Sequence, residues 1–330
     1  MEIGVEEMQQ NSFLQLKDNL SIPAIMAPMF LISNPRMVIQ ACKSGIIGSF
    51  PTLNARTADI LEEWMREIKS ELGESERANE YAPWAVNFIS HRSFNKRYDE
   101  DLRLIEKYQP PIVITSLGDP SPVAKIVHEY GGFVISDVIN VKFAKKAIEK
   151  GTDGLVLVSG GAGGHAGTLN PFAFIHEIRE IWDGPIILSG SISKGEDILA
   201  AEVIGADFVY MGTRFLLAEE SSTNESYKQM LLESTIEDII YTQAFSGIHA
   251  NYLIQSIERL GIDIKQLPKE GKIDYSTLEN PNIRAWKDIW GAGHGVGYLS
   301  ESQSVDKIVE ELRDQYNQAI LSVTRRGEFV

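Results

Sequence analysis

The sequence predicts an α/β protein built on a (β/α)8 TIM barrel, with a C-terminal helical extension that covers the mouth of the barrel. Two observations support this fold class. Eight short apolar runs alternate with amphipathic segments between Ile22 and Met211, and longer helix-like segments without such runs follow Met211. Strand–helix alternation of this kind requires parallel strands. An open doubly wound sheet is the alternative, but eight successive units fit a closed barrel better.

The eight predicted strands have nearly continuous apolar sequences, which are typical of parallel strands buried on both faces. We expect them at Ile22–Ala27, Ile46–Ser49, Trp84–Phe88, Ile112–Ser116, Phe133–Val138, Gly154–Val158, Pro185–Ser189 and Phe208–Met211.

The segments between the strands carry apolar residues at helical spacing, with lysines and glutamates between them. We expect helices at Thr57–Leu72, Leu102–Tyr108, Pro122–Tyr130, Lys142–Lys150, Pro171–Ile181 and Lys194–Ile204. Further helices are expected after the barrel, at Glu219–Ser234, Phe245–Leu260 and Val305–Val323. The chain therefore divides into a barrel at residues 1–220, a helical cap at 221–300 and a C-terminal helix at 301–330 that packs back on the barrel.

The composition favours a globular protein with a small-molecule ligand. Hydrophobic residues make up 43% of the 330 residues, which is enough for a large core. The formal net charge of -15 argues against nucleic-acid partners and anionic membranes, because both need a basic protein surface. No stretch approaches the roughly 18 apolar residues of a membrane span, and the first residues do not resemble a signal peptide. We therefore expect a cytoplasmic protein; the sequence leaves its oligomeric state open.

Cys42 is the one cysteine, so no intrachain disulfide can form. Its apolar neighbours, in a segment expected to be helical, indicate a buried structural thiol rather than a nucleophile. We expect no metal site.

In such a barrel the functional residues come from the carboxyl ends of the strands, so the residues that end each strand can be collected into one site. Small and polar residues dominate this set. The first strand ends at Ala27-Pro28-Met29, the third at Asn87, the fourth at Thr115-Ser116, and the fifth at Ser136-Asp137, with Lys142 shortly after.

The sixth strand is followed by Ser159-Gly-Gly-Ala-Gly-Gly-His-Ala-Gly167, in which five glycines surround one histidine. Glycines allow the backbone to approach a flat or phosphorylated ligand closely, and histidine has the pKa best suited to proton transfer near neutrality. This pattern predicts a binding and catalytic loop with His165 as its reactive residue. Taken alone, the stretch is equally consistent with a flexible loop and an incidental histidine.

Two glycine-containing turns follow the seventh and eighth strands, and each opens a helix. Backbone N–H groups of such turns, together with a helix N-terminus, can hold a phosphate; tight turns without a ligand are the alternative. A phosphate here, a floor of Pro28-Met29 and a wall of Gly163-Gly164 suit flavin mononucleotide (FMN) lying across the mouth. The two turns are Ser189-Gly190-Ser191-Ile192-Ser193 and Met211-Gly212-Thr213-Arg214.

Three motifs together resemble the nitronate monooxygenase family, formerly called the 2-nitropropane dioxygenases. They are Gly-Gly-His-Ala-Gly at 163–167, Ser-Gly-Ser-Ile at 189–192 and Met-Gly-Thr-Arg-Phe at 211–215. The similarity runs from about Ile22 to Ile254 and resumes at Trp286–Gly297. The related flavin-dependent enoyl-acyl-carrier-protein reductases share the barrel and a similar Gly-Gly-His turn. The resemblance therefore indicates fold and cofactor more directly than substrate.

The resemblance implies an FMN-dependent oxidoreductase that oxidises alkyl nitronates with O2, with nitroalkanes as further candidate substrates. His165 matches the histidine that acts as a base or orients the substrate beside the flavin. For Lys142, a surface lysine at a helix start is an equal alternative to a flavin contact. The family contacts FMN at positions matched by Asn87, Lys142, Gly164, Gly190 and Thr213. With the strand ends, the expected cofactor-binding residues are Ala27, Pro28, Met29, Asn87, Ser136, Lys142, Ser159, Gly163, Gly164, Ser189, Gly190, Ser191, Met211, Gly212 and Thr213.

The sequence departs from the family pattern in three places. Ser191 stands where the strand-seven turn usually has its second glycine, and the residues before the histidine loop lack an acidic side chain seen in many relatives. His294, within Trp286–Gly297, stands where relatives often carry glutamine. We expect His294 to contact the substrate; a glycine-rich bend between the cap and the last helix is the equal alternative.

Two other functions stay open at this point. An FMN-dependent reductase would use NAD(P)H on an enoyl thioester or a quinone. A barrel lyase or isomerase without flavin would use the two glycine turns to hold the phosphate of a sugar-like substrate.

Overall fold

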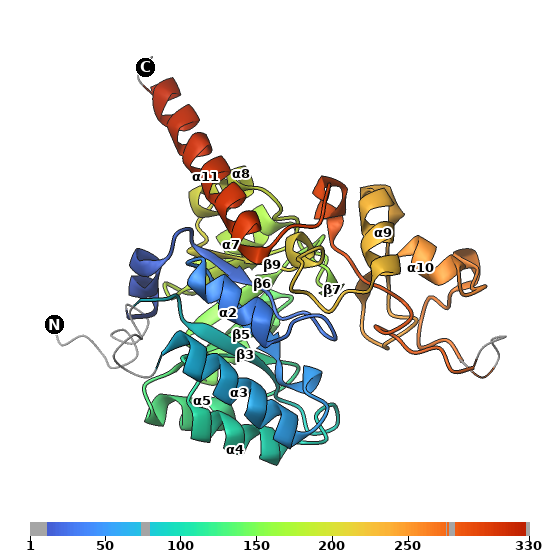
Figure 1. Cartoon of the computed structure of the whole chain (residues 1–330), viewed down its shortest axis with the longest axis horizontal. Helices are drawn as coiled ribbons and strands as arrows, with labels where there is room; N and C mark the ends of the chain where they lie inside the picture. The colour runs from blue at the N-terminus through green and yellow to red at the C-terminus, as the bar shows by residue number, and fades with distance from the viewer. Residues whose placement is uncertain (1–11, 74–79, 275, 277–280, 328–330) are drawn as a thin grey trace.

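The computed structural model describes residues 12–73, 80–274, 276 and 281–327 (Figure 1). Eight parallel strands form a closed barrel in chain order, so the predicted fold class is confirmed and the open sheet is excluded. All eight predicted strands are present, close to their expected bounds. They are β1 (Ala24–Met26), β2 (Ile47–Pro51), β3 (Trp84–Ile89), β4 (Ile112–Ser116), β5 (Phe133–Val138), β6 (Gly154–Val158), β8 (Ile186–Ser189) and β9 (Phe208–Met211).

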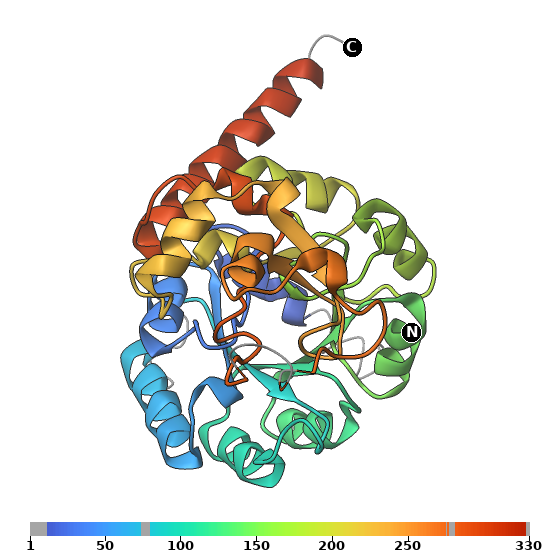
Figure 2. The ribbon, with the colours of Figure 1, turned by 90° about the vertical axis from the view of Figure 1, so that its right-hand side faces the viewer.

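Helices surround the strands as a ring (Figure 2). Several begin at a side-chain cap: Asn34, Asn140 and Asn170 each accept a hydrogen bond from a backbone N–H in the first turn of their helix. These caps determine where each strand-to-helix loop ends, and so they define the rim of the barrel mouth. The helices of the ring are α2 (Pro35–Lys43), α3 (Ala58–Leu72), α4 (Tyr98–Tyr108), α5 (Ser121–Glu129), α6 (Val141–Glu149), α7 (Pro171–Arg179) and α8 (Gly195–Val203). Short 3-10 helices lie at η1 (Leu16–Asn19), η2 (Thr52–Asn54), η3 (Thr213–Phe215), η4 (Ile236–Asp238), η5 (Ile264–Gln266) and η7 (His294–Tyr298).

Residues along each strand alternate between the barrel interior and the surface that faces the helices. On β5, Ile135 belongs to the interior cluster, whereas Val134 packs with the outer one. Phe13 fills the amino-terminal end of the barrel, where its ring meets those of Phe133 and Phe208 at centroid distances of 5.2 and 5.3 Å. Apolar packing thus closes this end, which leaves the carboxyl end for a ligand.

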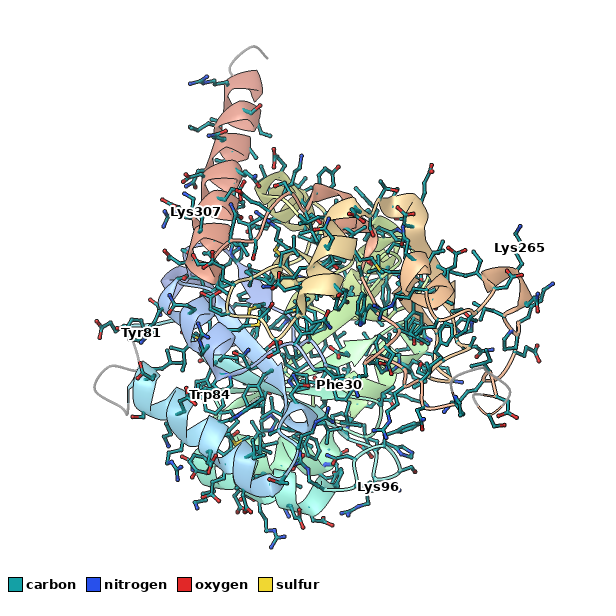
Figure 3. The ribbon with its side chains drawn as sticks, turned by 45° about the vertical axis from the view of Figure 1, so that its right-hand side comes forward. Phe30, Tyr81, Trp84, Lys96, Lys265 and Lys307 are labelled. Atoms are coloured by element: carbon teal, nitrogen blue, oxygen red, sulfur yellow. The ribbon has the colours of Figure 1, made fainter. Side chains whose placement is uncertain are left out.

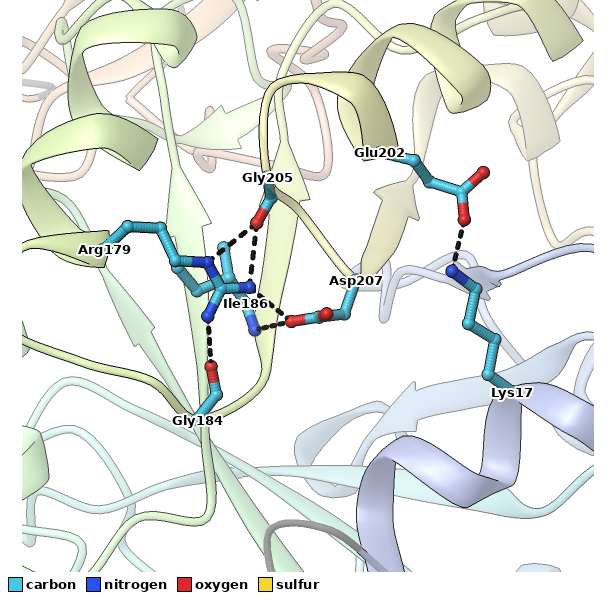
Figure 4. A network of polar contacts seen from close by, with 7 residues as sticks. All are labelled: Lys17, Arg179, Gly184, Ile186, Glu202, Gly205 and Asp207. Atoms are coloured by element: carbon cyan, nitrogen blue, oxygen red, sulfur yellow. Dashed lines mark hydrogen bonds and ion pairs between the residues drawn. The ribbon is translucent and has the colours of Figure 1, made fainter.

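A polar network at the amino-terminal ends of β8 and β9 joins these strands to α7 (Figure 4). The Arg179 guanidinium donates hydrogen bonds to the carbonyl oxygen of Gly184 at 2.7 Å and to that of Gly205 at 2.8 and 2.9 Å. It also contacts Asp207 Oδ2 at 2.6 Å, and this oxygen accepts the Ile186 N–H at 2.8 Å. One guanidinium therefore pairs with two carbonyl groups and a carboxylate at the end remote from the mouth.

Replacement of Arg179 by alanine is expected to lower the free energy of unfolding by about 2 kcal/mol, because these acceptors lose their donor. Chemical denaturation measures this change. The matched control is Arg92→Ala, which removes a surface ion pair with Asp99 whose side chains are 65% and 66% exposed. Exposed pairs contribute little, so the control should stay within about 0.5 kcal/mol of the wild type. Equal effects of the two variants would contradict a specific role for the Arg179 network.

The chain after β9 lies over the carboxyl end of the barrel (Figures 1 and 2). It contains α9 (Glu225–Glu233), β10 (Ile239–Thr242), β11 (Ala250–Leu253) and the short α10 (Ile254–Glu258). Figure 3 shows Lys265 at the outer edge of this extension, away from Phe30 in the first strand-to-helix loop.

The expected helix at Phe245–Leu260 is wrong, and so is the expectation that no strand follows Met211. β11 occupies the middle of that segment and pairs antiparallel with β10 on one edge and with β7 (Gly164–His165) on the other. Pairing on both edges explains the difference, since tertiary hydrogen bonds override a helix-like spacing of apolar residues.

The predicted C-terminal helix at Val305–Val323 is confirmed as α11 (Val305–Gly327). Its first turns pack against α2 and α8 through buried residues such as Ile308 and Leu312, and Lys307 lies on this part (Figure 3). The remaining turns project from the body of the protein (Figures 1 and 2).

Cys42 is buried in α2, as predicted for a structural thiol, and its Sγ lies 3.5 Å from the carbonyl oxygen of Pro83. Burial raises the pKa of this thiol to about 12, so it stays protonated. Within the described ranges, no helix is both long and apolar enough to cross a membrane. Over the same ranges, His, Cys, Asp and Glu side chains form no group of three that could hold a metal ion.

Candidate active site

His165 lies on β7, at the edge of the small sheet and opposite Ala250 of β11. Its Nε2 is 3.2 Å from Ser246 Oγ, and its ring meets that of Trp286 nearly perpendicularly, with 5.2 Å between centroids and 84° between planes. Trp286 has φ 68°, a left-handed conformation that is rare for a bulky residue. Strand pairing, the serine and the tryptophan therefore hold the imidazole in place. Within the glycine–histidine segment, Gly164 and His165 form the edge strand of the small sheet.

The hydrogen bonds of Ser246 favour a proton on Nε2 of His165. Ser246 Oγ donates its single proton to the carbonyl oxygen of Ile248 at 2.8 Å, so toward the imidazole this oxygen acts as an acceptor. A proton on His165 Nε2 completes this contact and leaves the lone pair on Nδ1; Ile248 N and the Tyr252 hydroxyl also approach Ser246 Oγ, both at 3.3 Å. Burial lowers the pKa of His165 to about 4, so the ring is neutral at pH 7. A neutral, oriented imidazole whose Nδ1 can accept a proton has the properties of a general base.

A small polar cavity lies between the turns that follow β6, β8 and β9. In the turn after β8, Gly190 has φ 116° and Ser191 has φ 58°, so Ser191 adopts a conformation that normally favours glycine. Among the described residues, the backbone N–H groups of Gly190, Ser191 and Gly212 donate no hydrogen bond to the protein. Unpaired N–H groups that line a cavity suit an anion such as a phosphate monoester. We call this cavity the anion cradle; it is lined by Gly161, Ala162, Gly163, Ser189, Gly190, Ser191, Ile192, Ser193, Tyr210, Gly212, Thr213, Gly293 and Gly295.

At the N-terminus of α8, the N–H groups of Ser193, Lys194 and Gly195 are paired within the protein, so this helix does not offer them to the anion cradle. Asp197 Oδ2 accepts the N–H groups of Ser193 at 2.8 Å and Lys194 at 2.9 Å. Gly195 N donates to Gln315 Oε1 at 2.9 Å. These donors are satisfied within the protein, so the turn itself provides the free N–H groups.

The segment around Gly293 closes one side of the anion cradle. Gly293 N donates to Thr213 Oγ1 at 2.9 Å, and His294 N donates to the carbonyl oxygen of Gly161 at 2.9 Å. A Cβ placed on Gly161 would lie 2.9 Å from His294 Nδ1 and 2.2 Å from Ser191 Oγ. The His294 side chain therefore packs beside the cradle. Contact of His294 with a substrate stays a prediction.

Aromatic packing holds this closing segment in position. Trp290 stacks on Tyr227, with 4.7 Å between ring centroids and 13° between planes. The Arg259 guanidinium lies 3.4 Å from the centroid of the Trp290 ring. Tyr227 also donates a hydrogen bond from its hydroxyl group to the carbonyl oxygen of Gly291. The extension thus fixes the Gly-rich segment against the barrel from outside.

Polar side chains of neighbouring strands form a chain of hydrogen bonds at the top of the barrel interior. Asn87 Nδ2 donates to Ser116 Oγ at 2.7 Å, and Ser116 Oγ donates to Asp137 Oδ2 at 2.5 Å. Asn87 Nδ2 also contacts the carbonyl oxygen of Ile114 at 3.1 Å. Asn87, a predicted flavin contact, is therefore joined to Asp137 through Ser116.

The other predicted flavin contacts have different surroundings. Ser136 Oγ lies 2.8 Å from Thr115 Oγ1, and the strand alternation places both residues on the helix-facing side of the barrel. Lys142 is exposed at the start of α6. Ser159 Oγ donates to the carbonyl oxygen of Ser189 at 2.6 Å and so ties the turns after β6 and β8 together.

The first strand-to-helix loop lies beside the turn after β9. Gly212 faces Ala27 and Met29: a Cβ placed on it would lie 3.6 Å from Ala27 Cβ and 3.7 Å from Met29 Cγ, which are ordinary contact distances. Pro28 lies between these two residues in the chain. Met211 packs with the outer cluster, so its side chain points away from the interior.

Two residues that face the interior were not among the expected cofactor contacts: Asp137, which the sequence placed only at the end of its strand, and Tyr210, which lines the anion cradle. Asp137 Oδ1 and the Tyr210 hydroxyl are buried, and neither has a hydrogen-bond partner among the described residues. The two-residue period of the strand could have identified Asp137, because Ile135 faces inward and Ser136 therefore faces outward.

The fold and this arrangement define a class of protein: a barrel that carries at its mouth a neutral imidazole and a polar cavity lined by glycine turns. The nitronate monooxygenase family model matches residues 11–315. The chain therefore belongs to the nitronate monooxygenase family, and it is an oxidoreductase of the flavin-dependent kind.

Curated relatives align over nearly the whole chain. The sequence is 27% identical over 349 residues to the nitronate monooxygenase of Paraburkholderia phytofirmans (strain DSM 17436 / LMG 22146 / PsJN), with 90% of this chain and 93% of the relative covered. It is 25% identical over 342 residues to the probable nitronate monooxygenase of Bacillus subtilis (strain 168), with 92% and 98% covered.

Solved structures share the fold at lower identity. The nitroalkane oxidase from Streptomyces ansochromogenes has a TM-score of 0.78 at 20% identity, with 93% of this chain and 99% of that chain covered. FabK from Thermotoga maritima has a TM-score of 0.74 at 20% identity, with 94% and 98% covered. At these identities the similarity establishes the barrel and its extension as a shared fold.

Proposed function

We propose that this chain is an FMN-dependent nitronate monooxygenase that oxidises alkyl nitronates with O2, and nitroalkanes once they have lost a proton. The observation that carries the proposal is the neutral, partly buried imidazole of His165, held by Ser246 and Trp286 at the mouth of a barrel that also carries the anion cradle. Family membership supports the reaction class. The partners in this proposal are small molecules, namely the nitronate and O2.

The residues of the mouth fit a phosphorylated flavin. Gly190, Ser191 and Gly212 offer N–H groups that the protein leaves unpaired, as a phosphate requires. The cradle also depends on the absence of side chains, since a Cβ on Gly163 would lie 2.9 Å from Gly293 N. The first strand is followed by Pro28-Met29 and not by the Gly-x-Gly-x-x-Gly pattern of dinucleotide sites, so FMN is preferred to FAD. When bound, FMN would carry electrons between the nitronate and O2.

His165 would act on the proton of the carbon that bears the nitro group. Transfer of this proton to Nδ1 gives an anionic nitronate and a cationic imidazolium, so the two products attract each other. Ser246 keeps the Nε2 proton in place, so no change of tautomer is needed before Nδ1 accepts. A nitronate supplied as the anion has already lost this proton. For that substrate His165 would serve only to hold and orient the anion.

The purified protein is expected to be yellow and to release FMN on denaturation, because the cradle offers unpaired N–H groups to a phosphate and no dinucleotide motif is present. Chromatography of the released cofactor against FMN and FAD standards measures this. Recovery of FAD, or of no flavin from a folded preparation, would contradict the proposal. Rapid anaerobic bleaching of the flavin by NAD(P)H, without turnover of nitronates, would instead support a reductase.

A further inference from the structure

Asp137 occupies the last inward position of β5. The strand alternation places Phe133, Ile135 and Asp137 on the interior side, and Asp137 is in register with Val156, another interior residue, on β6. Ser116 of β4 holds one carboxyl oxygen of Asp137, Oδ2, at 2.5 Å. The carboxyl group therefore has a defined orientation in the top layer of the barrel, at the end where the ligand would bind.

The second carboxyl oxygen of Asp137 is the unusual feature. Oδ1 is buried and has no hydrogen-bond partner among the described residues, and the same holds for the Tyr210 hydroxyl on β9. Tyr210 also lines the anion cradle, which connects this pair of groups with the proposed cofactor site. An unpaired buried polar atom costs free energy, so a group that pairs with it when the site is filled is the simplest explanation.

Asp137 and Tyr210 differ in how readily they change charge. Burial raises the pKa of Asp137 to about 6, although the hydrogen bond from Ser116 acts in the opposite direction. Burial, with a smaller contribution from the charge of Asp137, raises the pKa of Tyr210 well above its usual range, so the phenol keeps its proton. The neighbouring strands present Ser116 and Val156, which carry no charge. Burial thus brings the pKa of Asp137 close to neutral pH, at about 6, and takes the pKa of His165 away from it, to about 4.

We propose that Asp137 is a second proton-exchanging residue of this site, whose Oδ1 pairs with the flavin and whose charge changes with that of the ligand in the mouth. When negative charge develops there, the carboxylate takes up one proton from solvent and becomes a neutral carboxylic acid. When that charge leaves, the proton returns to solvent. No bond of the ligand is made or broken in this exchange. The identity of the ligand rests on the proposed function; the exchange itself rests on Asp137, Ser116 and Tyr210.

Asp137→Asn tests this inference, because an amide oxygen still accepts the hydrogen bond from Ser116 but cannot exchange a proton near pH 6. The matched control is Asp119→Asn, which removes an aspartate whose side chain is 50% exposed, on the loop after β4. Two measurements are made between pH 4 and 9. Infrared spectroscopy of flavin-free protein follows the protonated carboxyl band, and absorption spectroscopy follows the bound flavin.

Wild-type protein and Asp119→Asn are expected to show a transition near pH 6 in both measurements, and Asp137→Asn is expected to show neither. His165→Asn should keep both, since that imidazole titrates near pH 4. A flavin transition near pH 6 that persists in Asp137→Asn, or that disappears in His165→Asn, would overturn the inference. An infrared transition without a flavin response would remove Asp137 from the site but leave the proposed function intact. A folded protein that binds no flavin would overturn the proposed function, and the infrared titration would still decide the protonation of Asp137.

Ser116→Ala provides a second variant if Asp137→Asn fails to fold. The hydrogen bond from Ser116 stabilises the carboxylate, so its loss should move the infrared transition of Asp137 to higher pH. An unchanged midpoint, or one that moves to lower pH, would contradict the assignment of this transition to Asp137.

Discussion

Replacement of His165 by asparagine is expected to lower the turnover of a neutral nitroalkane by about 100-fold, which is the usual contribution of a general base. Asparagine keeps a polar side chain of modest size beside Ser246 but cannot accept a proton near neutral pH. A preformed nitronate needs no such transfer, so its oxidation should fall by much less, and FMN content should stay near the wild-type value. Steady-state rates with both substrates measure the difference.

The matched control is His249→Asn. His249 precedes β11, is exposed and stacks on Tyr241 at 5.0 Å between ring centroids, so its loss should leave both rates unchanged. Equal losses on nitroalkane and nitronate in His165→Asn would assign His165 to positioning or anion binding. Full activity on both substrates would exclude it from the reaction.

The pH dependence gives an independent check on His165. Because burial lowers its pKa to about 4, the base form predominates throughout the neutral range and is lost only as the pH falls toward 4. The ratio of the nitroalkane turnover rate of the wild type to that of His165→Asn should therefore be the same at pH 6 as at pH 7. A separate change in the turnover rate near pH 6 would arise from the protonation of Asp137, and it should persist in His165→Asn.

The fold was predictable from the sequence because each barrel strand carries its own evidence. The parallel strands are buried on both faces, so their apolar runs stand out without knowledge of the partner strand. Ala250–Leu253 lacks such a run, and its strand conformation depends on hydrogen bonds to β10 and to Gly164–His165. A pairing between segments about 85 residues apart leaves no local pattern in either segment.

The sequence predicted which backbone turns lie together at the candidate site. It predicted less well which side chains of the strands point toward that site. Residues 189–192 of the first glycine turn and Gly212-Thr213 of the second line one cavity, the anion cradle; a phosphate bound there stays a prediction. Ser136 was expected at the flavin, yet a one-residue difference along a strand reverses the face, and Asp137 takes the inward position. The start of α8 was also expected to offer N–H groups to a phosphate. Instead, the carboxylate of Asp197 accepts the hydrogen bonds of the N–H groups of Ser193 and Lys194. Sequence alone does not show which of two competing acceptors, a side chain or a ligand, takes those donors.

Gly190→Ala is expected to weaken FMN binding by about 100-fold, equivalent to about 2.7 kcal/mol, because it disturbs the turn that presents unpaired N–H groups to the phosphate. Gly190 has φ 116°, which disfavours any L side chain. A Cβ there would lie 2.6 Å from Ser159 Oγ and 2.9 Å from the carbonyl oxygen of Gly160. The added methyl group therefore pushes apart the turns after β6 and β8, which Ser159 joins by its hydrogen bond to Ser189.

The matched control is Gly212→Ala, in the partner turn. Its φ of -104° is accessible to alanine, and its Cβ would make only ordinary contacts, at 3.6 Å to Ala27 Cβ and 3.7 Å to Met29 Cγ. Its FMN affinity should stay within about threefold of the wild type, since both the N–H group and its direction are kept. Flavin fluorescence titration of the apoproteins gives the dissociation constants, and circular dichroism of each variant shows whether the barrel is folded. Wild-type affinity in a folded Gly190→Ala protein would move the phosphate away from this turn. Loss of affinity in both variants would mean that added bulk anywhere around the cradle is excluded, and that the N–H groups after β8 have no special part in holding the phosphate.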